Sequence, residues 1–156
     1  MEKHQQIAQN MFDICKQGAS ILSNEYKQLT VYGQFEVIIF NSLFAFIDIQ
    51  NNYKSLYQEV SNYFFRLLYH EAKAINIRLD NDTLVDLINS RYVFFNNEVE
   101  RLYSPQPAFP GGTFHVFYEN PLTLNPEISS NLPEILIYYK VLTTMMNYIA
   151  DDAGRL

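Results

Sequence analysis

The chain has 156 residues, a formal net charge of −6 at pH 7, a single Cys and no Trp. A chain of this length is expected to fold as one domain, covering residues 1–156, that needs no disulfide or metal to stabilise it. Its hydrophobic fraction of 48% and charged fraction of 18% exclude an intrinsically disordered protein. The acidic balance and scattered basic residues argue against nucleic-acid binding, which relies on Lys and Arg to neutralise phosphates.

The N-terminal residues and the cysteine content indicate where the protein works. Residues 1–9 are polar and lack the apolar segment of a secretory signal peptide. Cys15 is the single cysteine, so it has no partner for an intramolecular disulfide, which suits a reducing compartment. The most apolar stretch, residues 35–49, is shorter than a bilayer requires and carries Glu36 and Asp48. We therefore expect a cytoplasmic protein that does not span a membrane.

The spacing of apolar residues predicts two helices in the first third of the chain. The first covers residues 5–27 and contains Gly18, where the low helix propensity of glycine favours a kink or a break. The second covers residues 32–51 and is apolar around most of its circumference, which is typical of the central helix of a bundle. The β-branched run at residues 37–40 would also suit a strand, but the apolar segment around it is longer than most strands.

Three further helices are predicted in the rest of the chain. Residues 53–77 carry apolar side chains at helical spacing, with charged residues on the opposite face. The next helix begins near residues 80–83, a cluster of good N-cap residues that places negative charge at the positive end of the helix dipole. It ends before Ser104. The last helix is predicted from Asn131, where a capping-box spacing occurs, to about Ala150.

A long connection at residues 104–130 precedes the last helix. It contains five of the six prolines and the pair Gly111-Gly112, which favours a turn with positive φ. Residues 113–118 are apolar and aromatic, and they predict a short β segment. The expected fold class is therefore all-α: a single-domain bundle of four or five helices with this Pro-rich and aromatic loop before the last helix.

The sequence carries no recognisable catalytic, metal or cofactor motif. The residues His4, His70 and His115 lack the pair spacing of a metal site. The few glycines form neither a phosphate-binding loop nor a dinucleotide fingerprint, and no serine lies in a nucleophile elbow. Cys15 falls in an amphipathic helix and is expected to pack as a small hydrophobic residue. We therefore expect no catalytic residue, no metal and no cofactor, which favours a non-enzymatic protein.

Polar residues recur along the apolar second helix. Gln34, Asn41 and Asp48 repeat every seven residues, which predicts either a thin solvent-facing edge or a polar pocket inside the bundle. In the second case Asp48 is the charged group of the pocket, and His115 is a further candidate. Glu36 lies in the same helix, and a buried carboxylate must be paired, hydrogen-bonded or protonated. The alternative function is therefore a small-molecule-binding or enzymatic helical bundle with a pocket around Asp48.

The aromatic residues of the long connection are the second candidate site. They either pack over the bundle as a lid or form an exposed hydrophobic patch for a partner protein or a second subunit. An acidic surface suits a basic partner. The expected function is a protein-interaction or regulatory domain, for example an inhibitor or immunity-type protein, or a homodimer. The expected contact residues are Phe109, Phe114, Phe117 and Tyr118.

Overall fold

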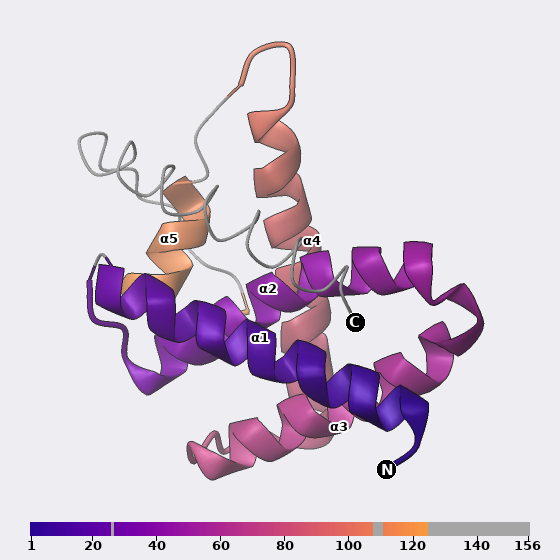
Figure 1. Cartoon of the computed structure of the whole chain (residues 1–156). Helices are drawn as coiled ribbons and strands as arrows, with labels where there is room; N and C mark the ends of the chain where they lie inside the picture. Colours follow the sequence, from indigo (N-terminus) through magenta and orange to yellow (C-terminus); the bar gives the residue numbers. More distant parts are fainter. Residues whose placement is uncertain (26, 108–110, 125–156) are drawn as a thin grey trace.

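A computed structural model of the chain describes residues 1–25, 27–107 and 111–124. These residues form five α-helices and one short 3-10 helix, and they contain no strand, which confirms the predicted all-α bundle (Figure 1). The elements are α1 (Lys3–Glu25), α2 (Val31–Asn52), η1 (Lys54–Leu56), α3 (Tyr57–Ala74), α4 (Asn81–Leu102) and α5 (Gly111–Tyr118). The helix predicted from Asn131 to Ala150 lies outside the described residues.

The central element of the bundle is α2, which contacts α1, α3, α4 and α5. Its first turn is capped by Thr30, whose hydroxyl accepts a hydrogen bond from the backbone N–H of Gly33 at 3.0 Å. By length and hydropathy α2 would pass for a membrane-spanning helix, but 61% of its most apolar window is buried inside the bundle. A core helix passes the same test, and the packing of α2 is that of a core helix.

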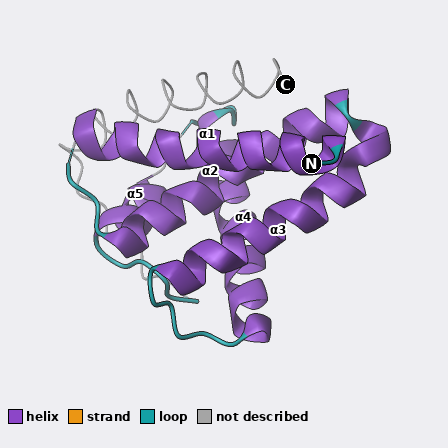
Figure 2. Ribbon diagram, turned by 60° about the horizontal axis from the view of Figure 1, so that its bottom comes forward, coloured by secondary structure: helices purple, strands orange, loops and turns teal. Residues whose placement is uncertain are grey.

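The other helices surround α2 in different directions. α1 lies along α2 and α3 (Figure 2), while α4 crosses α2 and its C-terminal half extends beyond it (Figure 1). α1 is continuous through Gly18, so the predicted break is wrong. Gly18 is buried on the same side as Cys15 and Leu22, and this packing outweighs the low helix propensity of glycine.

The segment after α4 differs from its prediction. Residues 113–118 belong to α5, so the predicted β segment is wrong, and the connection at 104–130 contains a helix. Gly111 and Gly112 begin α5, and neither has a positive φ, so the predicted turn is also wrong. A Cβ on Gly112 would lie 3.3 Å from the Glu98 side chain, which shows how closely α5 approaches α4. This tertiary contact outweighs the β propensity of the apolar run.

Phenylalanine rings connect the helices within the core. Phe40 of α2 makes edge-to-face contacts with Phe95 of α4 and Phe117 of α5, with ring centroids 5.2 and 5.5 Å apart. Phe46 makes a similar contact with Phe64 of α3 at 5.0 Å. Aromatic pairs of this geometry add to the free energy that burial supplies. These rings fix α3, α4 and α5 against one central helix.

The N-terminus of α4 is set by its sequence as predicted. The carboxylate of Asp80 accepts a hydrogen bond from the backbone N–H of Thr83 at 2.8 Å, which makes Asp80 the N-cap. This hydrogen bond holds the pKa of Asp80 below its ordinary value. The cap begins a helix whose inner face carries Leu84, Leu87, Ile88, Arg91, Phe95 and Glu98.

Candidate functional site

The interior contains an ion pair between α2 and α4. Arg91 Nε donates to both carboxylate oxygens of Glu36, at 3.0 and 2.9 Å, and Arg91 Nη2 donates to Oε1 at 2.9 Å. Both side chains are fully buried, unlike those of any other ion pair in the described part of the chain. Burial raises the pKa of Glu36, and the hydrogen bonds and charge of Arg91 oppose that rise.

A third element joins this pair from the segment after α5. The backbone N–H of Leu122 donates to Glu36 Oε1 at 2.7 Å. Leu122 has a φ of 59°, a left-handed conformation that is unusual for a side chain of this size. Glu36 therefore connects α2, α4 and the chain after α5. Because its carboxylate already accepts hydrogen bonds from Arg91 and Leu122, Glu36 has a structural role and is poorly placed to act as a general base.

Further polar atoms are buried near the contact of α4 with α5. Glu98 accepts from Arg101 Nη1 at 3.0 Å through Oε1, while its Oε2 is buried and has no hydrogen-bond partner among the described residues. Arg91 Nη1 and Thr113 Oγ1 are also buried, and neither has a hydrogen-bond partner in the part of the chain that the structure describes. Unpaired groups of this kind are usually satisfied by internal water. The Thr113 hydroxyl makes no hydrogen bond to a carboxylate within the described part of the chain, so the hydrogen-bonded nucleophile and base of a catalytic arrangement are not formed here.

The residues predicted to share a polar pocket lie in different environments. Asn41 is buried and its amide donates to the backbone carbonyl of Cys15 at 3.0 Å, which links α2 to α1. Asp48 accepts from the amide of Asn52, one turn further along α2, at 2.9 Å. His115 lies on α5, where its Nδ1 is 2.7 Å from Glu119 Oε2. Gln34 lines a cavity between α1, α2 and α3.

The structure does not bring Asp48 and His115 together. α5 packs against the N-terminal half of α2, where a Cβ on Gly33 would overlap the backbone carbonyl oxygen of Phe117. Asp48 lies near the opposite end of α2. A seven-residue repeat also drifts around a straight α-helix, because seven residues fall short of two full turns. Gln34 and Asn41 therefore meet different neighbours, although the sequence places them in one stripe.

The aromatic residues predicted to contact a partner are mostly internal. Phe114 and Phe117 are 3% and 1% exposed and lie within the core. Tyr118 is partly buried, with the Lys27 ammonium 5.7 Å from its ring centroid. Phe109 lies outside the described residues. In this conformation Phe114 and Phe117 belong to a packed helix, and neither ring is available to a partner.

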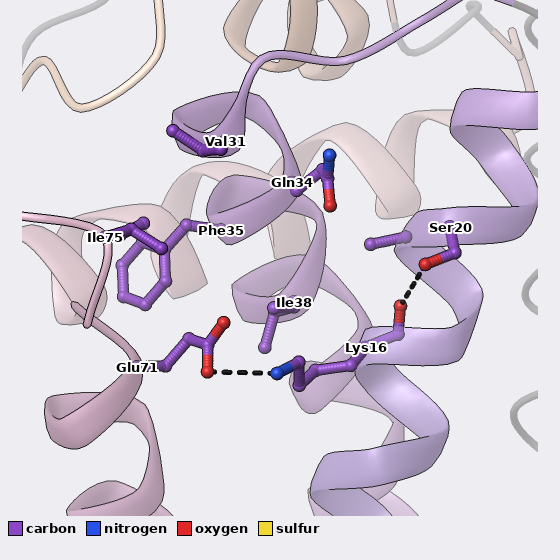
Figure 3. Close-up of a pocket in the computed structure, with 9 residues that line it drawn as sticks. Lys16, Ser20, Val31, Gln34, Phe35, Ile38, Glu71 and Ile75 are labelled. Carbon is purple, nitrogen blue, oxygen red and sulfur yellow. Dashed lines mark hydrogen bonds and ion pairs between the residues drawn. The ribbon is translucent and has the colours of Figure 1, made fainter.

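The cavity that Gln34 lines has a volume of about 250 Å³ (Figure 3). Lys16 of α1 and Glu71 of α3 meet at one side of it, with Nζ and Oε2 3.1 Å apart. The sequence pattern did not identify these two residues, because the periodicity of one helix does not reveal which residues of other helices approach it. The lining consists of Lys16, Ala19, Ser20, Val31, Gln34, Phe35, Ile38, Glu71 and Ile75.

The side of α4 that faces away from the bundle combines acidic and apolar residues. Val93 is 65% exposed and Val85 is 49% exposed. No ion pair of the described residues involves the carboxylates of this face, and the basic residue within this stretch, Arg91, points into the core. We call this surface the outer face of α4, and it consists of Asp82, Val85, Asp86, Asn89, Val93, Asn96 and Glu100.

Among the described residues, the side chains most often used in metal binding or nucleophilic chemistry are not gathered into a site. In residues 1–25, 27–107 and 111–124 no group of three or more His, Cys, Asp or Glu side chains is arranged to hold a metal ion. Cys15 is fully buried, as predicted, and burial raises the pKa of its thiol far above the ordinary value. Burial also raises the pKa of Tyr92, whose hydroxyl lies 2.7 Å from that of Ser42. Neither Cys15 nor Tyr92 is therefore readily ionised.

Comparisons with protein-family models, with curated proteins and with solved structures give no match for this chain. No activity, ligand or partner is therefore transferred to it from another protein. Among the described residues, the cavity and the outer face of α4 are the two surfaces with a composition suited to binding.

Proposed function

We propose that this chain is a non-enzymatic protein-interaction domain of the cytoplasm, and that the outer face of α4 contacts a basic protein partner. The observation that carries the proposal is one helix face that combines exposed valines with carboxylates that form no ion pair among the described residues. Asp82, Asp86 and Glu100 supply negative charge at three turns of the helix. Val85 and Val93 lie between them.

Charge and apolar area have separate roles in this proposal. Carboxylates without an ion-pair partner attract a positively charged protein and orient it during encounter. Exposed valines gain free energy when a partner removes them from water, which gives a complex its lifetime. Burial of Val93 would contribute more binding free energy than burial of Val85, because Val93 is 65% exposed in the isolated chain.

The state of the buried reactive groups supports a non-enzymatic function. Glu36 is held by Arg91 and by the N–H of Leu122, and Cys15 is sealed inside the core. The buried carboxylate of Glu36 and the buried thiol of Cys15 therefore both have a structural explanation. A substrate would reach neither group without opening the bundle.

A second copy of the chain is the alternative partner. Arg66, His70 and Lys73 are exposed on α3 at successive helical turns, so they present positive charge on one side of that helix. The outer face of α4 of another copy would complement this charge. Because the two surfaces differ, such a contact would be heterologous, and repetition would extend the assembly unless it closed into a ring.

The experiment that tests the proposal compares two variants that each lose three carboxylates. The first, D82N/D86N/E100Q, neutralises the outer face of α4. The control, D13N/E25Q/E59Q, neutralises exposed carboxylates of α1 and α3. Each immobilised protein is incubated with an extract of its source cells, bound proteins are identified by mass spectrometry, and the leading basic protein is purified for direct titration.

The proposal predicts that the wild-type chain and the control retain the same basic protein, and that the α4 variant loses it. The purified pair should also bind more weakly as the salt concentration rises. Sedimentation of the isolated chain tests for self-association in the same samples. Equal binding to both variants, or binding that salt does not change, would contradict a role for the outer face of α4.

A further inference from the structure

We propose that the cavity between α1, α2 and α3 binds a small zwitterion with an apolar body, of which an α-amino acid with an apolar side chain is the simplest example. This inference is independent of the protein-interaction proposal, because the cavity and the outer face of α4 share no residue.

The size of the cavity limits the ligand. Its volume of about 250 Å³ lies above the roughly 150 Å³ cavity that accepts benzene. It lies below the range of roughly 300–1,000 Å³ that is usual for drug-sized ligands. A molecule somewhat larger than benzene therefore fits within it.

One side of the cavity is apolar. Phe35 and Ile38 of α2 are 1% and 3% exposed and form its inner wall. Val31 and Ile75 continue this wall toward the opening (Figure 3). Val31 is 52% exposed, so a ligand that covered it would remove apolar surface from water. This wall suits an aliphatic or aromatic side chain.

The other side carries two opposite charges next to each other. Lys16 Nζ and Glu71 Oε2 are 3.1 Å apart, and their side chains are 45% and 21% exposed. A multiply charged anion would be repelled by Glu71, and a simple cation would be repelled by Lys16. A head group that carries both charges satisfies both residues. An α-amino acid holds its ammonium and carboxylate on one carbon atom, which matches the close spacing of Lys16 and Glu71.

Additional polar groups face the same space. The amide of Gln34 points into the cavity and makes no side-chain hydrogen bond within the described part of the chain (Figure 3). Ser20 donates to the carbonyl of Lys16 at the long distance of 3.4 Å. Glu71 uses one carboxylate oxygen for Lys16 and leaves the other directed toward the cavity (Figure 3). These groups supply the donors and acceptors that a zwitterionic head requires.

The ion pair between Lys16 and Glu71 does not obstruct binding. A partly exposed pair of this kind contributes little to stability because water and salt screen it. The two side chains can therefore separate and each contact the ligand. The charge-assisted hydrogen bonds formed with the ligand would replace the one that is lost.

The test is calorimetric titration of the chain with L-leucine and L-phenylalanine. The comparison compounds are isopentylamine and 4-methylpentanoate, which keep the apolar body but carry one charge each, and glycine, which lacks the body. We expect one of the two apolar amino acids to bind and all three comparison compounds to bind at least about tenfold more weakly, the change that accompanies loss of one charged contact or of the apolar contact.

Variants locate the site. K16M and E71Q should each weaken binding by about tenfold, whereas K73M, which removes an exposed ammonium of α3 outside the lining, should bind as the wild type does. S20L keeps both charges and fills the cavity from the exposed side of α1, so it should abolish binding. Circular dichroism confirms that each variant remains folded.

Three outcomes would overturn the inference. The first is that neither L-leucine nor L-phenylalanine binds at millimolar concentration. The second is that a singly charged analogue binds as tightly as the amino acid. The third is that S20L or E71Q, while folded, retains full affinity.

Discussion

Glu36 and Arg91 face each other inside the bundle with three hydrogen bonds between them and no exposed surface on either side chain. A buried pair of this kind holds two helices in one relative position, because separating them would leave each charge buried without a partner, which costs free energy. The pair is therefore a determinant of how α2 and α4 pack, and it can be tested by removing one partner or both.

The first prediction concerns removal of Arg91. In R91M the carboxylate of Glu36 remains buried without a cation, so we expect a loss of about 3–5 kcal/mol in the free energy of unfolding. In E36M/R91M both charges are replaced by apolar groups, so the double variant should be more stable than R91M. Urea denaturation measures both. A double variant as unstable as R91M would mean that packing, and not the unpaired charge, causes the loss.

The second prediction concerns the close contact of α2 with α5. Alanine favours a helix over glycine by about 1 kcal/mol, yet a Cβ on Gly33 would overlap the backbone carbonyl of Phe117. A backbone atom cannot rotate away, so we expect G33A to lose roughly 1–2 kcal/mol of stability. V31A, in the same turn but 52% exposed, should change it by less than about 0.5 kcal/mol. Stabilisation by G33A would show that α5 packs less closely on α2.

The third prediction separates a packed helix from an exposed aromatic patch. Phe117 is 1% exposed and contacts Phe40 and Phe95, so F117A should lose about 3–5 kcal/mol in chemical denaturation. Tyr103 is 74% exposed, so Y103A should stay within about 0.5 kcal/mol of the wild type. If F117A were as stable as Y103A, the ring of Phe117 would lie at the surface in solution.

The fourth prediction is a pH dependence at the start of α4. The N–H of Thr83 lowers the pKa of Asp80 from its ordinary value of 3.8, so folding favours the carboxylate. The stabilisation is complete above pH 3.8 and disappears as the pH falls through the lower pKa of the folded state. The difference in Tm between wild type and D80A should therefore be constant near neutrality and shrink in strong acid. A difference that persists there would exclude the charged cap as its source.

The fifth prediction concerns the thiol of Cys15. It is fully buried, and burial raises its pKa, so it should not react with Ellman's reagent at pH 8 while the chain is folded. In concentrated urea it should react at the rate of an ordinary cysteine. Rapid reaction of the folded chain would show that α1 separates from the bundle on the timescale of the assay.

Much of the helical framework could be predicted from the sequence because it depends on local patterns. The continuous apolar surface of residues 32–51 identified α2 as the central helix, and Asp80 marked the start of α4. Both signals lie within a few residues of the feature they predict. The β prediction for residues 113–118 failed because an apolar run without a polar face has no clear period, and contacts with α2 and α4 decide its conformation.

The candidate sites were harder to predict because they depend on which helices meet. Glu36 was recognised as a carboxylate that needs a partner, and Arg91 lies at an apolar-face position of α4, one turn from Leu87 and from Phe95. Glu36 and Arg91 could be recognised as a pair only with the knowledge that α2 crosses α4. The cavity could not be predicted for the same reason. Gln34 was identified from a pattern within α2, whereas Lys16 and Glu71 lie on α1 and α3.

The pairing of Glu36 with Arg91 also constrains how the chain can fold during its synthesis on the ribosome. Glu36 emerges 55 residues before its cation, and 86 residues before the amide of Leu122. By the end of the first interval α1, α2 and α3 have been synthesised, but closing them around a lone carboxylate is unfavourable. A folding intermediate that forms before α4 is synthesised therefore leaves the Glu36 side of α2 in contact with water. That side is buried only after α4 has been added.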